Sequence, residues 1–186
     1  MAVTLHQADL PEDLDLGPVV AVDTETMGLN PHRDRLCLVQ LSAGDGDAHL
    51  VQIARGQAEA PVLARLLENS ATLKLFHYAR FDVAMLAHHL GVVARPVWCT
   101  KVASKLTRTF TDRHGLRHLC GDLLGVDLSK QQQTSDWGAP ELSQAQLDYA
   151  AQDVLHLHAL REALAARLAR EGRSELAEAC FRFLPD

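Results

Sequence analysis

Two carboxylates stand one residue apart at the end of an apolar run, and they are the first residues of this chain that could do chemistry. Val19 to Val22 leads directly into Asp23-Thr24-Glu25. A short continuous apolar run is typical of a strand buried on both faces. Side chains at i and i+2 of a strand point the same way, so Asp23 and Glu25 should lie together, with Cα atoms ~6.5–7 Å apart. Because burying two like charges is unfavourable without a neutralising cation, this pair indicates a site for a hard divalent cation.

Two further acids lie at places that suggest the same site. Asp82 stands where the apolar stretch 73–77 gives way to a helical pattern, and Asp153 follows Tyr149 by four residues within another helical pattern. Alone, Asp82 is better explained as an acid at a helix N-terminus, and Asp153 as an exposed acid beside a boundary tyrosine. Together with the first pair, they make four carboxylates from separate segments. Such a set can bind two divalent cations ~3.5–4 Å apart, which suits phosphodiester hydrolysis.

The elements that must position these acids follow from the apolar patterns. Strands are expected at 19–26, 36–41, 49–53, 73–77 and 97–99, after an irregular entry segment at 1–18. Short links between the first three strands predict an antiparallel meander. Helices are expected at 61–68, 82–90, 100–109 and 115–124, and a long one opens with the capping box at Ser143 and runs to about Glu171. This order predicts an α/β fold, a central mixed sheet flanked by helices, in one domain over residues 1–186.

Composition and charge narrow the class of protein. No apolar run approaches the ~20 residues that span a bilayer, and the N-terminus does not resemble a signal peptide. Four cysteines without a Cys-x-x-Cys pair suit reduced thiols. We therefore expect a cytoplasmic protein with no membrane partner. The net charge of −6 argues against an extended duplex-binding surface, but it allows a short strand held by metal ions and a local basic patch.

The acidic segments resemble the motifs of a known superfamily. Asp23-Thr24-Glu25, Asp82 and Tyr149-Ala150-Ala151-Gln152-Asp153 match the three exonuclease motifs of the DEDD superfamily, and the tyrosine marks its DEDDy branch. The segment 130–137 is similar to ribonuclease D. We expect no additional helical RNA-binding domain, so the chain most resembles the short, stand-alone nanoRNase C group of diribonucleases. The likeness covers nearly the whole chain, with shared stretches at 23–40, 99–115, 129–137 and 180–185.

The resemblance implies a fold, a cofactor and an assembly. The superfamily's fold is ribonuclease H-like. Two divalent cations, Mg²⁺ or Mn²⁺, would be held by Asp23, Glu25, Asp82 and Asp153, and Tyr149 would orient the attacking water. Nucleotides would leave from the 3′ end as 5′-monophosphates. Likeness to nanoRNase C also favours a homo-oligomer, a ring-shaped octamer.

Further side chains are expected to bind substrate. They are Thr24, Met27, Leu29, His77, Lys101, Lys105, Arg108, Gln133, Ser135 and Trp137. Met27 would wedge between bases, or else pack in the core. His77 would contact the 3′ sugar or a phosphate, or else be structural. One helical face carries Lys101, Lys105 and Arg108 and could hold a 5′ phosphate. The alternatives are that this face is solvated or contacts another subunit. Trp137 would stack on a base or cap the core.

The leading functional hypothesis is a metal-dependent 3′–5′ exoribonuclease acting on very short RNA, most of all dinucleotides. A general ribonuclease D-like enzyme that trims longer RNA 3′ ends is the nearest alternative. A catalytically inactive nucleic-acid-binding domain is the alternative from another class. The four acids and Tyr149 are all present, and five such unfavourable positions have little purpose in an inactive domain.

Overall fold

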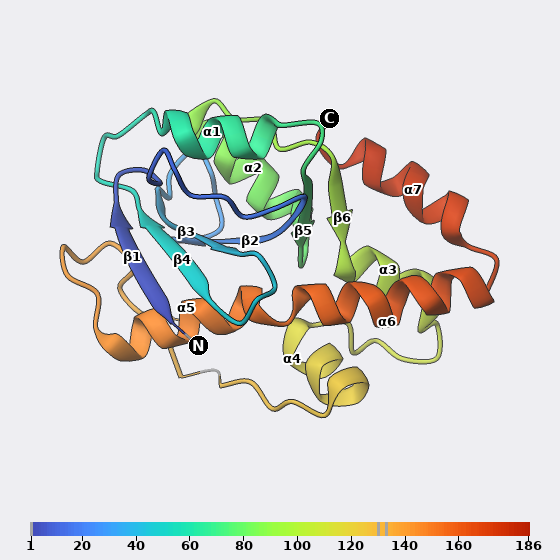
Figure 1. The fold of residues 1–186 in the computed structure, drawn as a ribbon. Helices are drawn as coiled ribbons and strands as arrows, with labels where there is room; N and C mark the ends of the chain where they lie inside the picture. The colour runs from blue at the N-terminus through green and yellow to red at the C-terminus, as the bar shows by residue number, and fades with distance from the viewer. Residues whose placement is uncertain (1, 130, 133) are drawn as a thin grey trace.

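The computed structural model describes residues 2–129, 131–132 and 134–186, and a six-stranded mixed sheet forms its centre (Figure 1). Its strands are β1 (Val3–Gln7), β2 (Val19–Thr26), β3 (Leu36–Ser42), β4 (Ala48–Gln52), β5 (Leu73–Phe76) and β6 (Val97–Cys99). Their order across the sheet is β1-β4-β3-β2-β5-β6. Strand β3 is antiparallel to β2 and β4, and every other neighbouring pair is parallel. The predicted mixed sheet and its antiparallel meander are confirmed.

Strand β1 is the main departure from the expected elements. Residues 1–18 were predicted to be irregular, yet Val3–Gln7 pairs in parallel register with Ala48–Gln52 at the edge of the sheet. The strand is short and only half-buried, so its apolar signal is weak. What makes it a strand is the open edge of β4, a tertiary feature that a local pattern does not contain.

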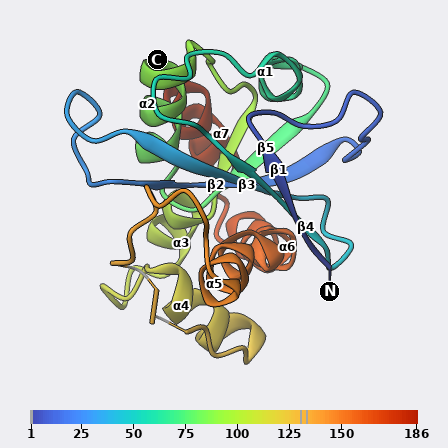
Figure 2. The ribbon, with the colours of Figure 1, turned by 90° about the vertical axis from the view of Figure 1, so that its left-hand side faces the viewer.

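Helices cover both faces of the sheet. They are α1 (Pro61–Glu68), α2 (Ala79–Leu90), α3 (Thr100–Thr107), α4 (Leu116–Leu119), α5 (Gln144–Leu155), α6 (Leu157–Arg170) and α7 (Ser174–Phe183), and a π-helical turn, Cys120–Leu124, follows α4. Figure 2 shows the sheet nearly edge-on, with α1 and α2 on one side and α4, α5 and α6 on the other. Within the part of the chain that the structure describes, no helix is both long enough and apolar enough to cross a membrane.

The long helix expected from Ser143 to about Glu171 is broken at His156. Its beginning is as predicted, because Ser143 N donates to Gln146 Oε1 at 2.9 Å while Gln146 N donates to Ser143 Oγ at 3.3 Å. At His156 the backbone leaves helical geometry (φ −107°, ψ −3°), and α6 begins at the next residue. The break lets α5 pack on β2, β3 and β4 while α6 packs on α3 and β5. Asp153 therefore lies on a helix that is pressed against the central strands.

The two central strands form a rigid platform for the site. All seven residues of β3 are buried, and Val20, Ala21 and Val22 of β2 are fully buried. Between the sheet and α5, a small apolar cluster contains Cys37, Leu38, Leu50, Trp137 and Ala150. Because packed interiors hold side chains in single conformations, groups at the end of β2 are presented with little freedom.

Candidate active site

Three carboxyl groups from β2 and α5 converge at one place. Asp23 and Glu25 lie two residues apart on β2, and Asp153 reaches them from α5. One oxygen from each of the three lies within 4.8 Å of the others. Packing of α5 on the sheet therefore brings Asp153 to Asp23 and Glu25, which lie 130 and 128 residues before it in the sequence.

Asp82 is the fourth acid, and it approaches from the opposite face of the sheet. It lies in the first turn of α2 and is almost fully buried. Thr24, which points to that face between the two acids of β2, donates from Oγ1 to Asp82 Oδ1 at 2.7 Å. Thr24 was expected to bind substrate, but its hydroxyl is buried and holds Asp82 instead.

Burial and mutual repulsion make these acids hard to ionise without a cation. Burial raises the pKa of Asp23 well above its usual range, and the charges of Asp82, Asp153 and Glu25 raise it further. Burial, followed by the charges of Asp153 and Asp82, raises the pKa of Glu25 to about 9. The pKa values of Asp82 and Asp153 rise to about 7, chiefly through burial. A cluster of hard carboxylate oxygens with this surplus of negative charge fits divalent cations such as Mg²⁺ or Mn²⁺.

Tyr149 presents a protonated hydroxyl beside the acids. It lies one helical turn before Asp153 on α5 and lines the same pocket. Burial raises the pKa of its phenol, and the charges of Asp153, Glu25 and Asp23 raise it further, so the hydroxyl keeps its proton. A phenol in this state can donate a hydrogen bond to a water or a phosphate oxygen near the cluster.

A pocket of about 350 Å³ opens over the cluster, and cationic side chains lie among its walls. The acids Asp23 and Asp153 and the phenol of Tyr149 form part of its lining. The other lining residues are His77, Tyr78, Lys101, Gly115, Leu116, Arg117, His118, Leu128 and Ser129. Lys101 Nζ lies 4.0 Å from the centre of the Tyr78 ring. The pocket therefore combines a site for cations with positive groups that could hold a phosphate.

The structure brings some of the predicted substrate residues to this pocket and not others. His77 and Lys101 line it. Met27 and Leu29 follow β2 and expose 50% and 82% of their surface, which leaves both free to contact a ligand. Lys105 is exposed and Ser135 half-buried in a turn, and neither lines the pocket. Gln133 lies outside the described residues.

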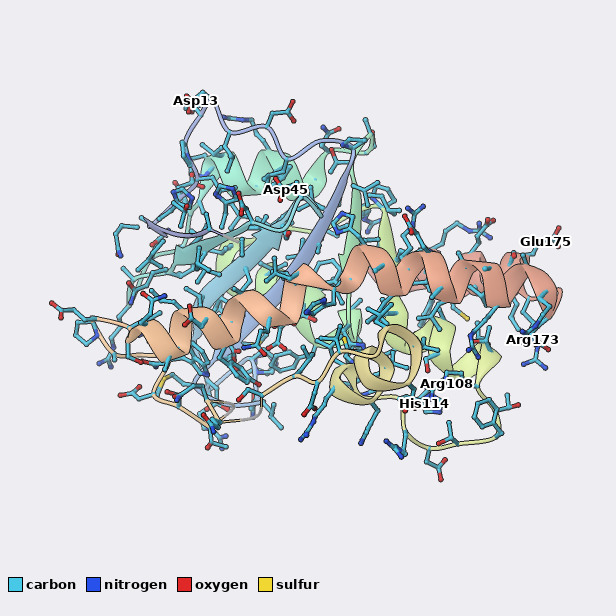
Figure 3. The ribbon with its side chains drawn as sticks, turned by 60° about the horizontal axis from the view of Figure 1, so that its bottom comes forward. Asp13, Asp45, Arg108, His114, Arg173 and Glu175 are labelled. Atoms are coloured by element: carbon cyan, nitrogen blue, oxygen red, sulfur yellow. The ribbon has the colours of Figure 1, made fainter. Side chains whose placement is uncertain are left out.

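Arg108 and Trp137 have partners in the protein. The Arg108 guanidinium is buried, donates to the carboxylate of Asp122 and bonds the backbone oxygen of Arg113. Figure 3 shows Arg108 beside His114, in the segment between α3 and α4. Trp137 exposes only 2% of its surface and packs 6.0 Å from the ring of Tyr149, so stacking on a base is excluded and the core alternative holds. Packing of the 136–138 turn on α5 decides this, and no local pattern reveals it.

Several residues of the site were missed from the sequence. Tyr78, whose backbone is left-handed (φ 72°), and Ser129 line the pocket. Arg117 and His118, which belong to the basic patch that the sequence shows between 101 and 118, line it too. Gln40 lies opposite Asp23 in the β2–β3 register, and its amide Nε2 donates to Asp23 Oδ2 at 3.4 Å. A polar residue in the middle of an otherwise apolar strand was the available signal for Gln40.

Comparison with known proteins agrees with this geometry. Residues 6–169 match a family model described as 3′-5′ exonuclease. The chain is 38% identical to ribonuclease D of Granulibacter bethesdensis over 156 residues, covering 84% of this chain and 39% of that protein. It is 39% identical to ribonuclease D of Acidiphilium cryptum over 166 residues, with 89% and 42% covered. The chain thus spans about two-fifths of the length of these relatives.

Solved structures provide a match over the full length of the chain. Brucella melitensis NrnC with bound Mg²⁺ is 56% identical, with a TM-score of 0.95 covering 100% of this chain and 90% of that one. Brucella melitensis NrnC bound to pGG is 57% identical, with a TM-score of 0.96 and the same coverage. Escherichia coli RNase D, at 24% identity and a TM-score of 0.79, covers 90% of this chain and 44% of that one, and shares the fold.

Proposed function

Because this chain belongs to the 3′-5′ exonuclease family, we propose that it is a metal-dependent 3′–5′ exoribonuclease that hydrolyses very short RNA, dinucleotides above all. The observation that carries the proposal is the convergence of Asp23, Glu25 and Asp153 beside a pocket that Asp23, Tyr149 and Asp153 line. Asp82 lies close enough for its charge to raise the pKa of Asp23. These five residues are the proposed catalytic residues.

The acids are proposed to hold two divalent cations. Asp23, Glu25 and Asp153 would bind one, and Asp23 would share the second with Asp82. When bound, such cations lower the pKa of a water and offset the charge of the scissile phosphate and leaving oxygen. Their hard oxygen donors, and the Mg²⁺ in the structure of Brucella NrnC, support this cofactor.

The chain's own groups complete the reaction. The protonated Tyr149 hydroxyl orients the water that attacks phosphorus. The bond that forms joins this water oxygen to phosphorus, and the bond that breaks joins phosphorus to the 3′ oxygen of the penultimate nucleotide. The water gives up one proton, and the leaving 3′ oxygen takes up one. The products are a nucleoside 5′-monophosphate and an RNA with a free 3′ hydroxyl. Thr24 keeps Asp82 oriented throughout.

The preference for very short RNA rests on the shape and charge of the pocket. At about 350 Å³ it is small, and the cations Lys101 and Arg117 line it together with the acids. A 5′ phosphate gripped by these cations would place the next phosphodiester over the acids only when the RNA is short. The structure of Brucella NrnC bound to pGG supports a short ligand.

Trimming of longer RNA 3′ ends is the second candidate. The identity of 38–39% to ribonuclease D proteins favours it, although this chain spans only part of their length. An open path from the pocket would admit longer strands, and the cleavage rates below separate the two.

The proposal extends to assembly and location. We propose that residues 1–186 are one exonuclease domain that forms a homo-oligomer, with an octamer favoured by the likeness to nanoRNase C. The exposed rings of Phe110 (77%) and Phe183 (75%) support contacts between subunits. The free thiols of the four cysteines support a cytoplasmic location.

The test is a series of cleavage rates on 5′-labelled RNAs of about two to about seven nucleotides and one long RNA, with Mg²⁺ or Mn²⁺. A steep preference for the dinucleotide supports the proposal, whereas similar rates at every length favour general trimming. Asp23→Ala should remove the activity. An absence of metal-dependent cleavage from the wild-type protein would leave only a nucleic-acid-binding domain.

A further inference from the structure

The imidazole of His77 is held in place by the hydroxyl of Thr100. His77 is the first residue after β5, and Thr100 is the first residue of α3. Thr100 Oγ1 lies 2.8 Å from His77 Nδ1 and donates to the backbone oxygen of Phe76 at 3.2 Å. Thr100 is fully buried, so bulk water does not compete for its hydroxyl.

One tautomer of His77 satisfies both of these contacts together. A threonine hydroxyl has one proton, and a carbonyl oxygen can only accept. Both contacts are hydrogen bonds at once only when Thr100 donates to Phe76 and its Oγ1 accepts from His77 Nδ1–H, and this tautomer leaves Nε2 with a lone pair. Burial and the nearby charge of Lys101 lower the pKa of His77 to about 3, so the ring is neutral at neutral pH.

The lone pair of Nε2 is available to a ligand in the pocket. Across residues 2–129, 131–132 and 134–186, no side chain or backbone group forms a hydrogen bond with this nitrogen. Nε2 is also absent from the buried side-chain atoms that lack a partner, so it reaches accessible surface. His77 lines the pocket together with Asp23, Tyr149 and Asp153, and Nε2 is the polar atom it has left to offer there.

An acceptor at this position selects among the groups of a nucleic acid. Phosphate oxygens only accept hydrogen bonds at neutral pH, so a neutral Nε2 has nothing to offer them. The sugar hydroxyls of RNA donate, and the 2′ hydroxyl is the group that distinguishes RNA from DNA. We infer that His77 Nε2 accepts a hydrogen bond from a ribose hydroxyl of the bound substrate, an inference that rests on the proposed exoribonuclease function.

Thr100 is a positioning residue in this arrangement. Its hydroxyl fixes the tautomer of His77 and the orientation of the ring without touching the substrate. The pocket thereby gains a preference for ribose that does not depend on the base. A substrate that fills the pocket but lacks the hydroxyl leaves this acceptor unpaired, so that substrate is disfavoured.

The test compares wild type with His77→Phe on a 5′-phosphorylated ribodinucleotide and on analogues that lack single hydroxyls. One analogue lacks the 3′ hydroxyl, and two others lack the 2′ hydroxyl of the first or second nucleotide. We expect one of these deletions to lower kcat/KM of the wild type by about 10-fold, the loss of one hydrogen bond. His77→Phe should cleave the ribodinucleotide with a kcat/KM lower than that of wild type by a similar factor. In this variant the same hydroxyl deletion should lower kcat/KM no further. If the hydroxyl deletion lowers kcat/KM by the same factor in His77→Phe as in wild type, the inference is overturned.

A second measurement does not depend on activity. Nitrogen-15 NMR of the imidazoles should show His77 with a protonated Nδ1 and an unprotonated Nε2. Thr100→Val should remove this tautomer preference, and Thr100→Ser should keep it. A wild-type His77 protonated on Nε2 would exclude the inference.

His114 is the matched control. Its Nδ1 lies 2.8 Å from Ser104 Oγ, a histidine–hydroxyl pair like that of His77, but it does not line the pocket and lies beside Arg108 (Figure 3). His114→Phe should leave the hydroxyl preference unchanged. If wild type cleaves no RNA, the proposed function fails whatever the NMR result. If it cleaves RNA with no hydroxyl preference linked to His77, only this inference fails.

Discussion

The four acids of the site give the metal-free protein an unusual dependence of stability on pH. The folded-state pKa of Asp82 and Asp153 is about 7 and that of Glu25 about 9, all above the ordinary values of 3.8 and 4.5. Between the ordinary and the raised value, the folded chain binds more protons than the unfolded chain, so stability falls as pH rises. In the presence of a chelator we therefore expect Tm to fall from about pH 5 to about pH 8, and Mg²⁺ to reduce this fall.

Asp153→Asn isolates the contribution of one charge to that behaviour. With a chelator at about pH 8, the variant should melt above wild type by about 3 °C, the shift produced by one kcal/mol in a domain of this size. It should also gain less from Mg²⁺. Glu162→Gln, which removes an exposed acid of α6, should melt like wild type at each pH. Parallel pH profiles for wild type and Asp153→Asn would contradict the prediction.

Gln40 allows a test of how Asp23 is held. Its amide donates to Asp23 Oδ2 at 3.4 Å, and its Oε1 is buried with no partner within the described residues. Gln40→Leu removes both groups, so the loss of the unpaired oxygen should offset much of the lost hydrogen bond and leave Tm nearly unchanged. Because the amide no longer orients Asp23, the variant should bind Mg²⁺ more weakly. Its kcat/KM for short RNA should be lower by about 10-fold.

Gln40→Glu is the contrasting variant, because it places a fifth carboxyl group in the same buried region. Gln40→Glu should melt below wild type at neutral pH. The two proteins should melt alike only at acidic pH, where the new carboxyl group is protonated. Calorimetric titration with Mg²⁺, together with melting curves, separates the two variants. Unchanged Mg²⁺ affinity in Gln40→Leu would show that Asp23 is held by other contacts.

At the scale of elements, the sequence predicted what a periodic pattern can carry. The central strands β2 and β3 and the helix α1 were predicted within a residue or two of their bounds, because apolar runs and a proline at the helix start are strong local signals. The capping box at Ser143 was confirmed for the same reason. Strand β1 and the break at His156 were not predicted. Strand β1 forms because it pairs with the edge of the sheet, and the helix breaks at His156 because α5 and α6 pack on different neighbours.

The link between β5 and β6 is held by a buried lysine that the sequence did not reveal. Lys74 is fully buried in β5, and its ammonium donates to the backbone oxygens of Asn69 at 2.8 Å, Thr72 at 2.6 Å and Arg95. Three acceptors match the three donors of an ammonium group. Lys74→Met should leave these oxygens unpaired and destabilise the fold by about 2–4 kcal/mol in urea unfolding.

Lys105→Met is the control for that substitution, because Lys105 is exposed on α3. It should change the free energy of unfolding by less than about 0.5 kcal/mol. Because His77 follows β5 by one residue, Lys74→Met should also loosen the ring of His77. An equal effect of the two substitutions on unfolding would show that the three backbone oxygens find other partners.

At the scale of the whole molecule, the acids were predictable and their surroundings were not. Spacing and resemblance placed Asp23, Glu25, Asp82, Tyr149 and Asp153 in one site. The structure clusters Asp23, Glu25 and Asp153 and lines one pocket with Asp23, Tyr149 and Asp153, and the catalytic roles of these residues stay a prediction. Which cations reach the pocket depends on competing partners. Arg108 is taken by Asp122, whereas Lys101 lines the pocket, and both follow the same helical spacing in the sequence.

The chain as a whole is acidic, whereas two cationic side chains line its pocket, and this difference predicts opposite effects of salt on short and long RNA. The net charge is −6, while Lys101 and Arg117 line the pocket. For a dinucleotide that lies within the pocket, added salt should screen these cations and lower kcat/KM. A long RNA also meets the acidic surface, so salt should first raise its cleavage rate by screening repulsion. Cleavage rates of both substrates in about 20 to about 300 mM KCl test these two expectations. Lys101→Met should weaken the salt dependence of dinucleotide cleavage and leave that of long RNA unchanged. Equal salt slopes for both substrates would show that long RNA avoids the acidic surface and enters through an open basic path, as general 3′-end trimming requires.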